Sequence, residues 1–159
     1  MSEFKIYLAG GMTGMSWEDQ NKWRENLKFQ INYKNESHGY NRKLRIINPC
    51  DYYNFEQKRH QKEEEIMNYD LWHVRNSNLI IVNLNNPNSI GTAMELAIAR
   101  EYKIPIVALL EWNPERDKEK YPSFEDKIQT IHPWIRICCD RFEPNMYTLA
   151  DFISDFYLK

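Results

Sequence analysis

The sequence lacks the features of several large protein classes. Its 159 residues contain no apolar run near the 18 residues that a membrane-spanning helix needs. An acidic residue stands where a signal peptide would have its basic segment. The formal net charge of −2 gives no electrostatic reason to expect nucleic acid or a membrane surface as a partner. We therefore expect a cytoplasmic protein that binds neither.

Cysteine and histidine are scarce and carry no metal-binding pattern. The three cysteines, Cys50, Cys138 and Cys139, form no C-x-x-C pair, and their odd number argues against a disulfide framework. The four histidines are scattered and form no H-E-x-x-H motif. We expect reduced, buried thiols, no metal site and no cofactor.

Apolar residues, by contrast, are plentiful enough for a folded core. The hydrophobic fraction is 42% and the aromatic fraction 14%, which argues against disorder. A chain of 159 residues has the length of one ordinary domain, and no repeat or linker interrupts it. The sequence therefore predicts a single domain over residues 1–159.

The stretch 78–101 is the most informative part of the chain. Residues 79–84 are apolar except for one asparagine, as in a strand buried on both faces of a parallel sheet. Turn formers follow at residues 85–89, and Gly91 then opens an alanine-rich helix. In such a strand–turn–helix unit ligands bind outside the carboxyl ends of the strands, against helix N-termini. Glu95, a single acid in an apolar turn, is therefore a candidate for chemistry. The alternative is a carboxylate that merely favours the helix dipole by about 0.3–1 kcal/mol.

Strand and helix patterns alternate along the rest of the chain. We expect the other strands at residues 4–9, 44–47, 104–110 and 134–138, and the other helices from Trp17 through Ile31, up to about Arg75, and at residues 148–157. This order predicts a doubly wound α/β domain, with a five-stranded parallel sheet and helices on both faces. Residues 32–42 are interpreted as a loop. The charged residues 111–131 are interpreted as an excursion that covers the pocket or reaches a neighbouring subunit.

The first loop, GGMTGM at residues 10–15, directly follows the first strand. Glycines let a backbone approach a ligand closely, and bare amides with a hydroxyl can hold an anion or a sugar. No Gly-Lys-Ser/Thr follows, and G-x-G-x-x-G is absent, so the loop is neither a Walker A loop nor a dinucleotide fingerprint. Ser16 and Asp19 then resemble a capping box at the start of the next helix.

Three segments together resemble the nucleoside 2-deoxyribosyltransferase family, which includes the deoxynucleoside 5′-monophosphate N-glycosidases. The segments are KIYLAGGMTG at residues 5–14, NYDLWHVRNSNLIIV at residues 68–82 and SIGTAMELAIA at residues 89–99. Their order and spacing also match, and the resemblance extends from about Lys5 to about Leu110. It implies a flavodoxin-like sheet, a nucleoside or nucleotide substrate, and a homo-oligomer whose active sites are completed by a neighbouring subunit.

The resemblance also implies a retaining reaction at the anomeric carbon of a deoxyribose. Glu95 would attack C1′ and expel the nucleobase, Tyr7 would hydrogen-bond Glu95 from the end of the first strand, and Asp70 would help to protonate the leaving base. Retaining glycosidases likewise use two carboxyl groups, one as the nucleophile and one as the acid for the leaving group. An acid in that role needs the raised pKa that burial gives. From the residues alone, Tyr7 would be interpreted as a core aromatic and Asp70 as a solvated helix acid.

The substrate is expected against the first loop and the start of the third helix. The candidate binding residues are Gly10, Gly11, Met12, Thr13, Ser89, Gly91 and Thr92. In the family, transferases that act on free nucleosides commonly carry an acid six residues before the nucleophile, and the monophosphate N-glycosidases carry a serine that helps to hold the phosphate. This chain has Ser89 there. A hydroxyl and helix amides suit a phosphate, and a helix N-cap is an equally economical explanation.

Three functional hypotheses follow. The first is an enzyme that transfers the deoxyribose of a 2′-deoxynucleoside between bases, or alternatively hydrolyses a deoxynucleoside 5′-monophosphate. The second is a module that binds a nucleotide in the same pocket without turnover. The third is a flavin-binding protein, weakened by a first loop that lacks a Ser/Thr-rich phosphate turn. The presence of Glu95, Tyr7 and Asp70 together favours the enzyme, because a binding module needs no nucleophile.

Overall fold

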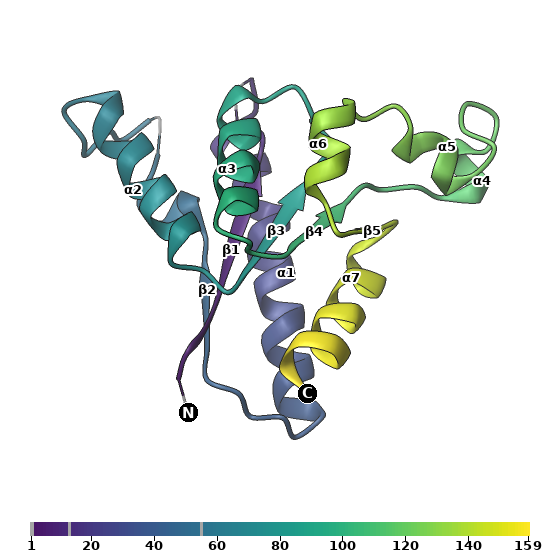
Figure 1. Cartoon of the computed structure of the whole chain (residues 1–159), viewed down its shortest axis with the longest axis horizontal. Coiled ribbons are helices and arrows are strands. Elements are labelled where there is room, and N and C mark those ends of the chain that lie inside the picture. Colours follow the sequence, from purple (N-terminus) through teal and green to yellow (C-terminus); the bar gives the residue numbers. More distant parts are fainter. Residues whose placement is uncertain (1, 13, 55) are drawn as a thin grey trace.

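The computed structural model describes residues 2–12, 14–54 and 56–159, and its centre is a five-stranded parallel sheet (Figure 1). The strands are β1 (Phe4–Gly10), β2 (Leu44–Ile47), β3 (Leu79–Asn83), β4 (Ile106–Leu109) and β5 (Arg141–Glu143). Their spatial order, β2-β1-β3-β4-β5, is that of a flavodoxin-like doubly wound sheet. The predicted fold class is confirmed.

One face of the sheet is covered by α1 (Trp17–Ser37), α7 (Met146–Phe152) and the π-helical segment η2 (Ile153–Leu158). Leu27 and Ile31 of α1 and Leu149 of α7 pack on the aliphatic side chains of the central strands. The predicted closing helix at 148–157 is thus present, with slightly wider bounds.

The predicted loop at residues 32–42 is wrong in its first half, because α1 continues to Ser37. Asn35 explains the error. It lies one turn beyond Ile31 on the buried face, and its side chain bonds both the N–H and the C=O of Arg42. A buried asparagine that ties down the following turn looks, in the sequence, like one more loop residue.

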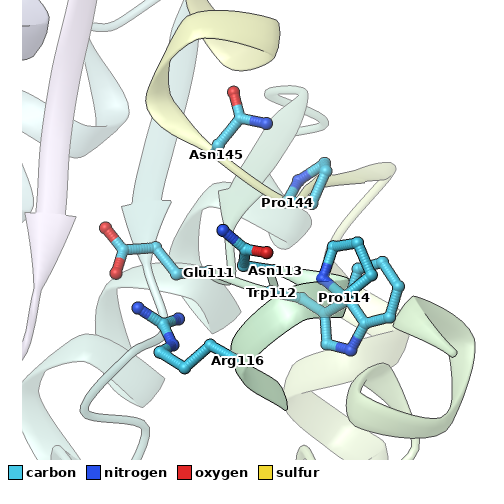
Figure 2. Close-up of a pocket in the computed structure, with 7 residues that line it drawn as sticks. All are labelled: Glu111, Trp112, Asn113, Pro114, Arg116, Pro144 and Asn145. Atoms are coloured by element: carbon cyan, nitrogen blue, oxygen red, sulfur yellow. The ribbon is translucent and has the colours of Figure 1, made fainter. Parts of the chain in front are cut away.

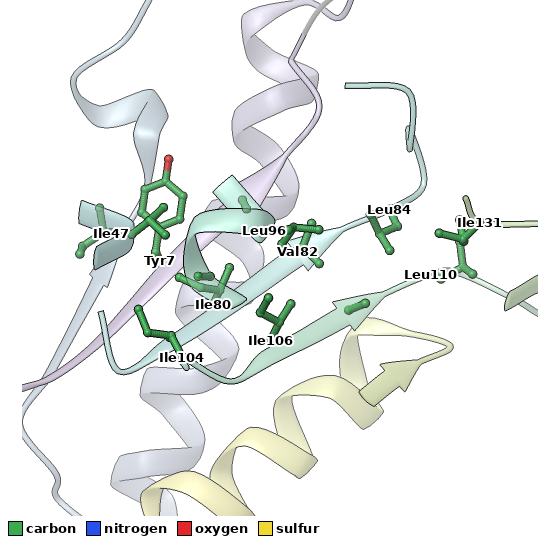
Figure 3. Close-up of a cluster of buried hydrophobic side chains, with 14 of the residues drawn as sticks. Tyr7, Ile47, Ile80, Val82, Leu84, Leu96, Ile104, Ile106, Leu110 and Ile131 are labelled. Atoms are coloured by element: carbon green, nitrogen blue, oxygen red, sulfur yellow. The ribbon is translucent and has the colours of Figure 1, made fainter. Parts of the chain in front are cut away.

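The opposite face carries α2 (Glu63–Arg75), α3 (Ile90–Glu101), α5 (Phe124–Ile128) and α6 (Pro133–Cys138). Leu96 and Ala99 of α3 and Val74 of α2 are buried there against Ile80 and Val82 of β3. Figure 3 shows this cluster, with the Tyr7 hydroxyl pointing away from the aliphatic side chains around it. Because helices cover both faces, the central strands are nearly continuous apolar runs.

The predicted fifth strand at residues 134–138 is wrong, because this segment forms α6. Pro133 occupies the first helical turn, and the His132 side chain accepts a hydrogen bond from the Trp134 N–H at 3.2 Å. Ile135 and Cys138, three residues apart, pack against the core, so a helical period prevails over the apparent alternation. The fifth strand is the shorter β5, which follows α6.

The excursion at 111–131 contains α4 (Pro114–Asp117) and α5, and Figure 1 shows both at the opposite end of the molecule from α2. The segment is anchored by Ile128 and Ile131, which lie in the core. Its first residue also donates a backbone hydrogen bond to the Asn85 side chain at 2.8 Å. None of the helices in the described residues combines the length and the apolar character that crossing a membrane would require.

Candidate active site

The first loop and the β3–α3 loop meet at the carboxyl edge of the sheet, between β1 and β3. A Cβ atom added at Gly11 would lie 2.9 Å from the Asn86 carbonyl oxygen and 3.4 Å from the Ser89 Cβ. Only a glycine allows this approach. The neighbouring strands β1 and β3 are where the winding direction changes, the usual position of a ligand in such sheets.

Helix α1 contacts the first loop through Gln20 and Trp23. The Gln20 side-chain amide donates to the carbonyls of Met12 and Met15 at 2.8 and 2.9 Å. Gly10 packs so closely that an added Cβ would lie 3.0 Å from the Trp23 ring. Of the loop residues predicted to bind substrate, Gly10 therefore serves packing and Met12 is held through its carbonyl. Thr13 lies outside the described residues.

Arg24 lies beneath the same loop and is 1% exposed. Its guanidinium donates to the carbonyls of Leu8, Gly10 and Gln20 at 3.2, 3.2 and 2.6 Å. Burial lowers the pKa of Arg24, and its positive charge lowers the pKa of both Glu95 and Asp70. A buried positive charge thus favours the ionised forms of the two candidate carboxyls.

Tyr7 and Glu95 are joined directly, as the family resemblance implied. The Tyr7 hydroxyl donates to Glu95 Oε1 at 2.8 Å. Tyr7 lies in the middle of β1 rather than at its end, so the expectation of its position was wrong. The side chain is fully buried, and its length brings the hydroxyl to α3.

Burial sets the protonation of this pair. It raises the pKa of Glu95 to about 8, with the negative charge of Asp70 as the second contribution; Tyr7 and Arg24 act in the opposite direction. Burial and the charge of Glu95 also raise the pKa of Tyr7 well above its ordinary value. Tyr7 therefore remains a hydrogen-bond donor to Glu95.

Asp70 on α2, like Glu95, accepts a hydrogen bond from a tyrosine. The Tyr52 hydroxyl donates to Asp70 Oδ1 at 2.6 Å. Tyr52 follows the 3₁₀ helix η1 (Pro49–Asp51), just beyond the carboxyl end of β2. Burial raises the pKa of Asp70 to about 6, against the opposing effects of Tyr52 and Arg24. Asp70 is therefore a carboxyl that can hold a proton near neutral pH.

A pocket of about 200 Å³ lies between α2 and α3 and contains both carboxyls. Its lining residues are Glu63, Ile66, Met67, Asp70, Leu71, Gly91, Met94 and Glu95. The walls are thus largely apolar, with Asp70 on the α2 side and Glu95 on the α3 side. An added Cβ at Gly91 would meet no atom within 4 Å, so the missing side chain leaves this part of the pocket open.

Ser89 and Thr92 lie at the start of α3 and bond each other. Ser89 is the N-cap, and its Oγ accepts from the Thr92 N–H at 3.3 Å and from the Thr92 hydroxyl at 3.1 Å. Ser89 lines a different hollow, beside His132 and Trp134. The structure thus places Asp70, Gly91 and Glu95 in the lining of one pocket, with the buried Tyr7 bonded to Glu95. Ser89 and Thr92 lie in the helix cap at the start of α3.

Two further hollows lie at this edge of the sheet. One of about 240 Å³ is lined by Gly11 and the asparagines Asn83, Asn85 and Asn86, together with Met15 and Trp23. The other, of about 390 Å³, is formed by residues of the excursion with Pro144 and Asn145 (Figure 2). The lining of the α2–α3 pocket that the structure describes contains no residue from 111–131. That this segment reaches a neighbouring subunit stays a prediction.

No metal-binding cluster emerges from the described part of the chain, where no three His, Cys, Asp or Glu side chains are grouped to hold an ion. Sequence reasoning missed Tyr52, Arg24 and Gln20 as parts of the site. Tyr52 could have been suspected from its position, because it follows the carboxyl end of β2, a strand that neighbours β1. The burial of Arg24 and Gln20 depends on tertiary packing and has no local signature.

No protein-family model and no curated protein matches the sequence. Solved structures do match over most of the chain. A conserved protein from Enterococcus faecalis V583 aligns with a TM-score of 0.68 and 19% identity, over 97% of this chain and 99% of that one. A 2-deoxyribosyltransferase from Bacillus psychrosaccharolyticus aligns with a TM-score of 0.62 and 15% identity, over 92% and 90%.

The CMP N-glycosidase BcmB from Clostridium botulinum aligns with a TM-score of 0.53 and 18% identity, over 97% of this chain and 99% of that one. At these identities the comparisons show a shared fold. This fold is also the one that the sequence resemblance implied.

Proposed function

We propose that this protein is an enzyme that breaks the N-glycosidic bond of a 2′-deoxynucleoside and transfers the sugar through a glycosyl-glutamate intermediate. One observation carries the proposal: Glu95, held by the Tyr7 hydroxyl at 2.8 Å, shares an apolar-walled pocket with the protonatable carboxyl of Asp70. A nucleophile on one wall and an acid on the other are the two groups that a retaining reaction requires.

In the first step Glu95 attacks the sugar. Because Oε1 accepts the Tyr7 hydrogen bond, Oε2 is the oxygen left to form the bond to C1′. The C1′–N bond breaks, its electron pair goes to the nucleobase, and Asp70 gives the leaving base its proton. The products are a glycosyl ester of Glu95 and a neutral base, so charge and atoms balance.

In the second step an acceptor attacks C1′ from the face that the base has left. The acceptor is a second nucleobase in transfer and a water molecule in hydrolysis. The ester bond to Glu95 breaks, its carboxylate is restored, and Asp70 takes the proton that the acceptor loses. Two displacements at C1′ retain its configuration.

The raised pKa values of both carboxyls allow the pair to keep a proton near neutral pH. The reactive arrangement has Glu95 ionised and Asp70 protonated, so the pair holds one proton between them. With Asp70 near 6 and Glu95 near 8, the pair carries one proton around neutral pH, and without substrate this proton lies mainly on Glu95. The reactive form is the one in which the proton has passed to Asp70. Ionised Glu95, whose conjugate acid has a raised pKa, is also a more basic nucleophile than an ordinary carboxylate.

The structural neighbours add support of a coarser kind. A 2-deoxyribosyltransferase and a CMP N-glycosidase both act on N-glycosidic bonds, and both align with this chain over at least 90% of their lengths. We favour a free 2′-deoxynucleoside as substrate and a second base as acceptor. The alternative substrate is a deoxynucleoside 5′-monophosphate, for which the Ser89 hydroxyl at the α3 N-terminus would be a donor.

A product assay tests the proposal. The protein at high concentration is incubated with each deoxynucleoside and each 5′-monophosphate, with and without a second base, alongside Glu95→Ala. Base exchange on free nucleosides that the variant lacks is the expected result. Base release from monophosphates alone would instead support the hydrolase. Nucleotide binding without turnover of any substrate would overturn the enzyme proposal in favour of a binding module, and a yellow purified protein would favour a flavoprotein.

We also propose a homo-oligomer. Large apolar side chains are exposed along α2, α3 and α6, namely Met67, Trp72, Ile90, Met94, Trp134 and Ile137. An apolar surface of this kind beside an open pocket is typical of a protein interface. Light scattering during gel filtration is expected to give a multiple of the protomer mass, and a monomer at micromolar concentration would contradict the proposal.

A further inference from the structure

Tyr52 takes no part in the steps proposed above, but its ring is closely packed against α2. Its ring is stacked on His73 with centroids 5.6 Å apart and contacts Tyr69 edge-on at 4.7 Å. His73 is itself buried on α2. Helix α2, which carries Asp70, thus also fixes the ring whose hydroxyl bonds Asp70.

The hydroxyl of Tyr52 is a permanent donor. Burial and the charge of Asp70 raise the pKa of Tyr52 far above its ordinary value, so the O–H keeps its proton. The bond to Asp70 Oδ1 is short, at 2.6 Å. A carboxyl that accepts a hydrogen bond at Oδ1 carries its own proton on the other oxygen, Oδ2.

We propose that Tyr52 is a positioning residue for the leaving-group acid, holding Asp70 Oδ1 so that the proton on Oδ2 is presented to the nucleobase in the α2–α3 pocket. The inference rests on the proposed function, and it names the residue that orients the acid. Tyr52 touches no reacting atom and acts through Asp70. The arrangement parallels that of Tyr7, which occupies Glu95 Oε1 and leaves Oε2 to react.

The proton affinity of Asp70 responds to groups from several elements. The titratable and charged side chains around the Asp70–Tyr52 pair are Tyr7 on β1, Arg24 on α1, Tyr53 after η1, Glu63 and His73 on α2, and Glu95 on α3. Tyr52 donates to the ionised form of Asp70 and so lowers its pKa. Removing only this hydroxyl is therefore expected to raise the pKa of Asp70.

Tyr52→Phe tests the proposal, because phenylalanine keeps the ring contacts with His73 and Tyr69. Tyr69→Phe is the matched control, since it removes a hydroxyl from the adjoining ring and leaves the Tyr52–Asp70 bond in place. Carbon-13 NMR follows the carboxyl carbons of labelled aspartate through a pH titration, with the Asp70 signal identified by its absence in Asp70→Asn. We expect the Asp70 titration to move to higher pH in Tyr52→Phe and to stay unchanged in the control. An unmoved Asp70 signal in Tyr52→Phe would overturn the inference.

A double-mutant cycle tests the same proposal by its effect on kcat. Tyr52→Phe is expected to lower kcat roughly 10-fold in the wild-type background, because the acid is less well oriented. In the Asp70→Asn background it should change kcat less than about twofold, since there is no acid left to orient. A loss of equal size in both backgrounds would mean a merely structural role and would contradict the proposal. A protein without any turnover would overturn the proposed function, and the NMR titration would still decide whether Tyr52 sets the proton affinity of Asp70.

Discussion

The α2–α3 pocket and the excursion place carboxyl groups in opposite surroundings. In the pocket, Asp70 and Glu95 are partly withdrawn from water and receive hydrogen bonds from neutral tyrosine hydroxyls, and the pKa of each is raised. In the excursion, Asp117 accepts two hydrogen bonds at 2.9 Å from the exposed Arg116 guanidinium and one at 2.8 Å from the Asn113 backbone, and its pKa is lowered.

The difference lies in the surroundings and not in the acid: burial raises the pKa of Asp70 and Glu95 against the opposing effect of the tyrosine hydroxyls, whereas hydrogen bonds lower the pKa of Asp117. A guanidinium or a backbone N–H in water stabilises the ionised form, which fixes a local turn and is useful only as structure. A hydroxyl in a low-dielectric pocket orients a carboxyl and still leaves it able to gain or lose a proton near neutral pH. Substitutions at the two places should therefore have very different consequences.

The largest effect is expected at Glu95. Glu95→Gln keeps an oxygen that can accept the Tyr7 hydrogen bond but removes the nucleophile, so kcat should fall about 10³-fold or more. Mass spectrometry of acid-quenched wild-type protein should detect the glycosyl ester, which the variant cannot form. Activity within tenfold of wild type would place the nucleophile elsewhere.

Asp70→Asn should lower kcat about 10²- to 10⁴-fold, the range typical of a lost general acid. The loss should shrink for a substrate whose base leaves readily without protonation. The wild-type pH profile of kcat/KM should be bell-shaped with apparent pKa values near 6 and 8 that belong to the pair. In the variant only one limb should remain, the ionisation of Glu95, and its apparent pKa should lie below about 8, because the charge of Asp70 no longer raises the pKa of Glu95. An unchanged bell would show that another group supplies the proton.

Tyr7→Phe should have a smaller effect of roughly 10- to 100-fold on kcat, the equivalent of one hydrogen bond to a charged group. The ring stays buried and the fold is kept, but the hydroxyl that lowers the pKa of Glu95 is lost. Carbon-13 NMR of labelled glutamate should therefore show Glu95 titrating at higher pH than in wild type. A titration at lower pH would contradict the assigned hydrogen bond.

The stability of the fold should also depend on Glu95. The pKa of Glu95 is raised from its ordinary value of 4.5 to about 8 in the folded protein, so its ionisation opposes folding. The wild type should lose stability as pH rises from about 4.5 to about 8, and Glu95→Gln should not share this loss. By pH 8 the variant should be the more stable by about 1–3 kcal/mol in denaturant titrations. Equal stability of the two proteins at pH 5 is the internal control.

The smallest effect is expected at Asp117. Asp117→Asn weakens the ion pair with the exposed Arg116, and salt screens the contribution of such a pair. We expect no change in kcat and only a slight loss of stability that disappears at high ionic strength. A clear loss of activity would mean that the excursion takes part in catalysis, either in its own protomer or in a neighbour.

The parts of the fold that were predictable are those in which local pattern and tertiary environment agree. An apolar run followed by turn formers and a capped helix predicts β3 and α3, and the place of Glu95 in that unit made it a candidate. Residues 134–138 and 32–37 were misjudged because a proline-initiated helix and a buried asparagine determine them, and neither produces a regular pattern.

The site was predictable only in part, for a related reason. The bond from Tyr7 to Glu95 joins residues 88 positions apart, and the bond from Tyr52 to Asp70 joins a post-strand turn to a helix. The first pair could be inferred from family resemblance, whereas the second needed coordinates. The electrostatic roles of burial and of Arg24 likewise depend on what surrounds a side chain, which no local window of sequence describes.

Gly11 and Gly91 differ in how much room they have to vary during evolution. At Gly11 even one methyl group would collide with the carbonyl of Asn86, whereas at Gly91 an added methyl group would meet open space in the pocket. Adaptation to a smaller substrate can therefore begin with one substitution at residue 91, which narrows the pocket without disturbing the backbone. A change at residue 11 would require both adjoining loops to be rebuilt together. The pocket wall at residue 91 is thus free to diverge, whereas the contact between the two loops at residue 11 is hard to change.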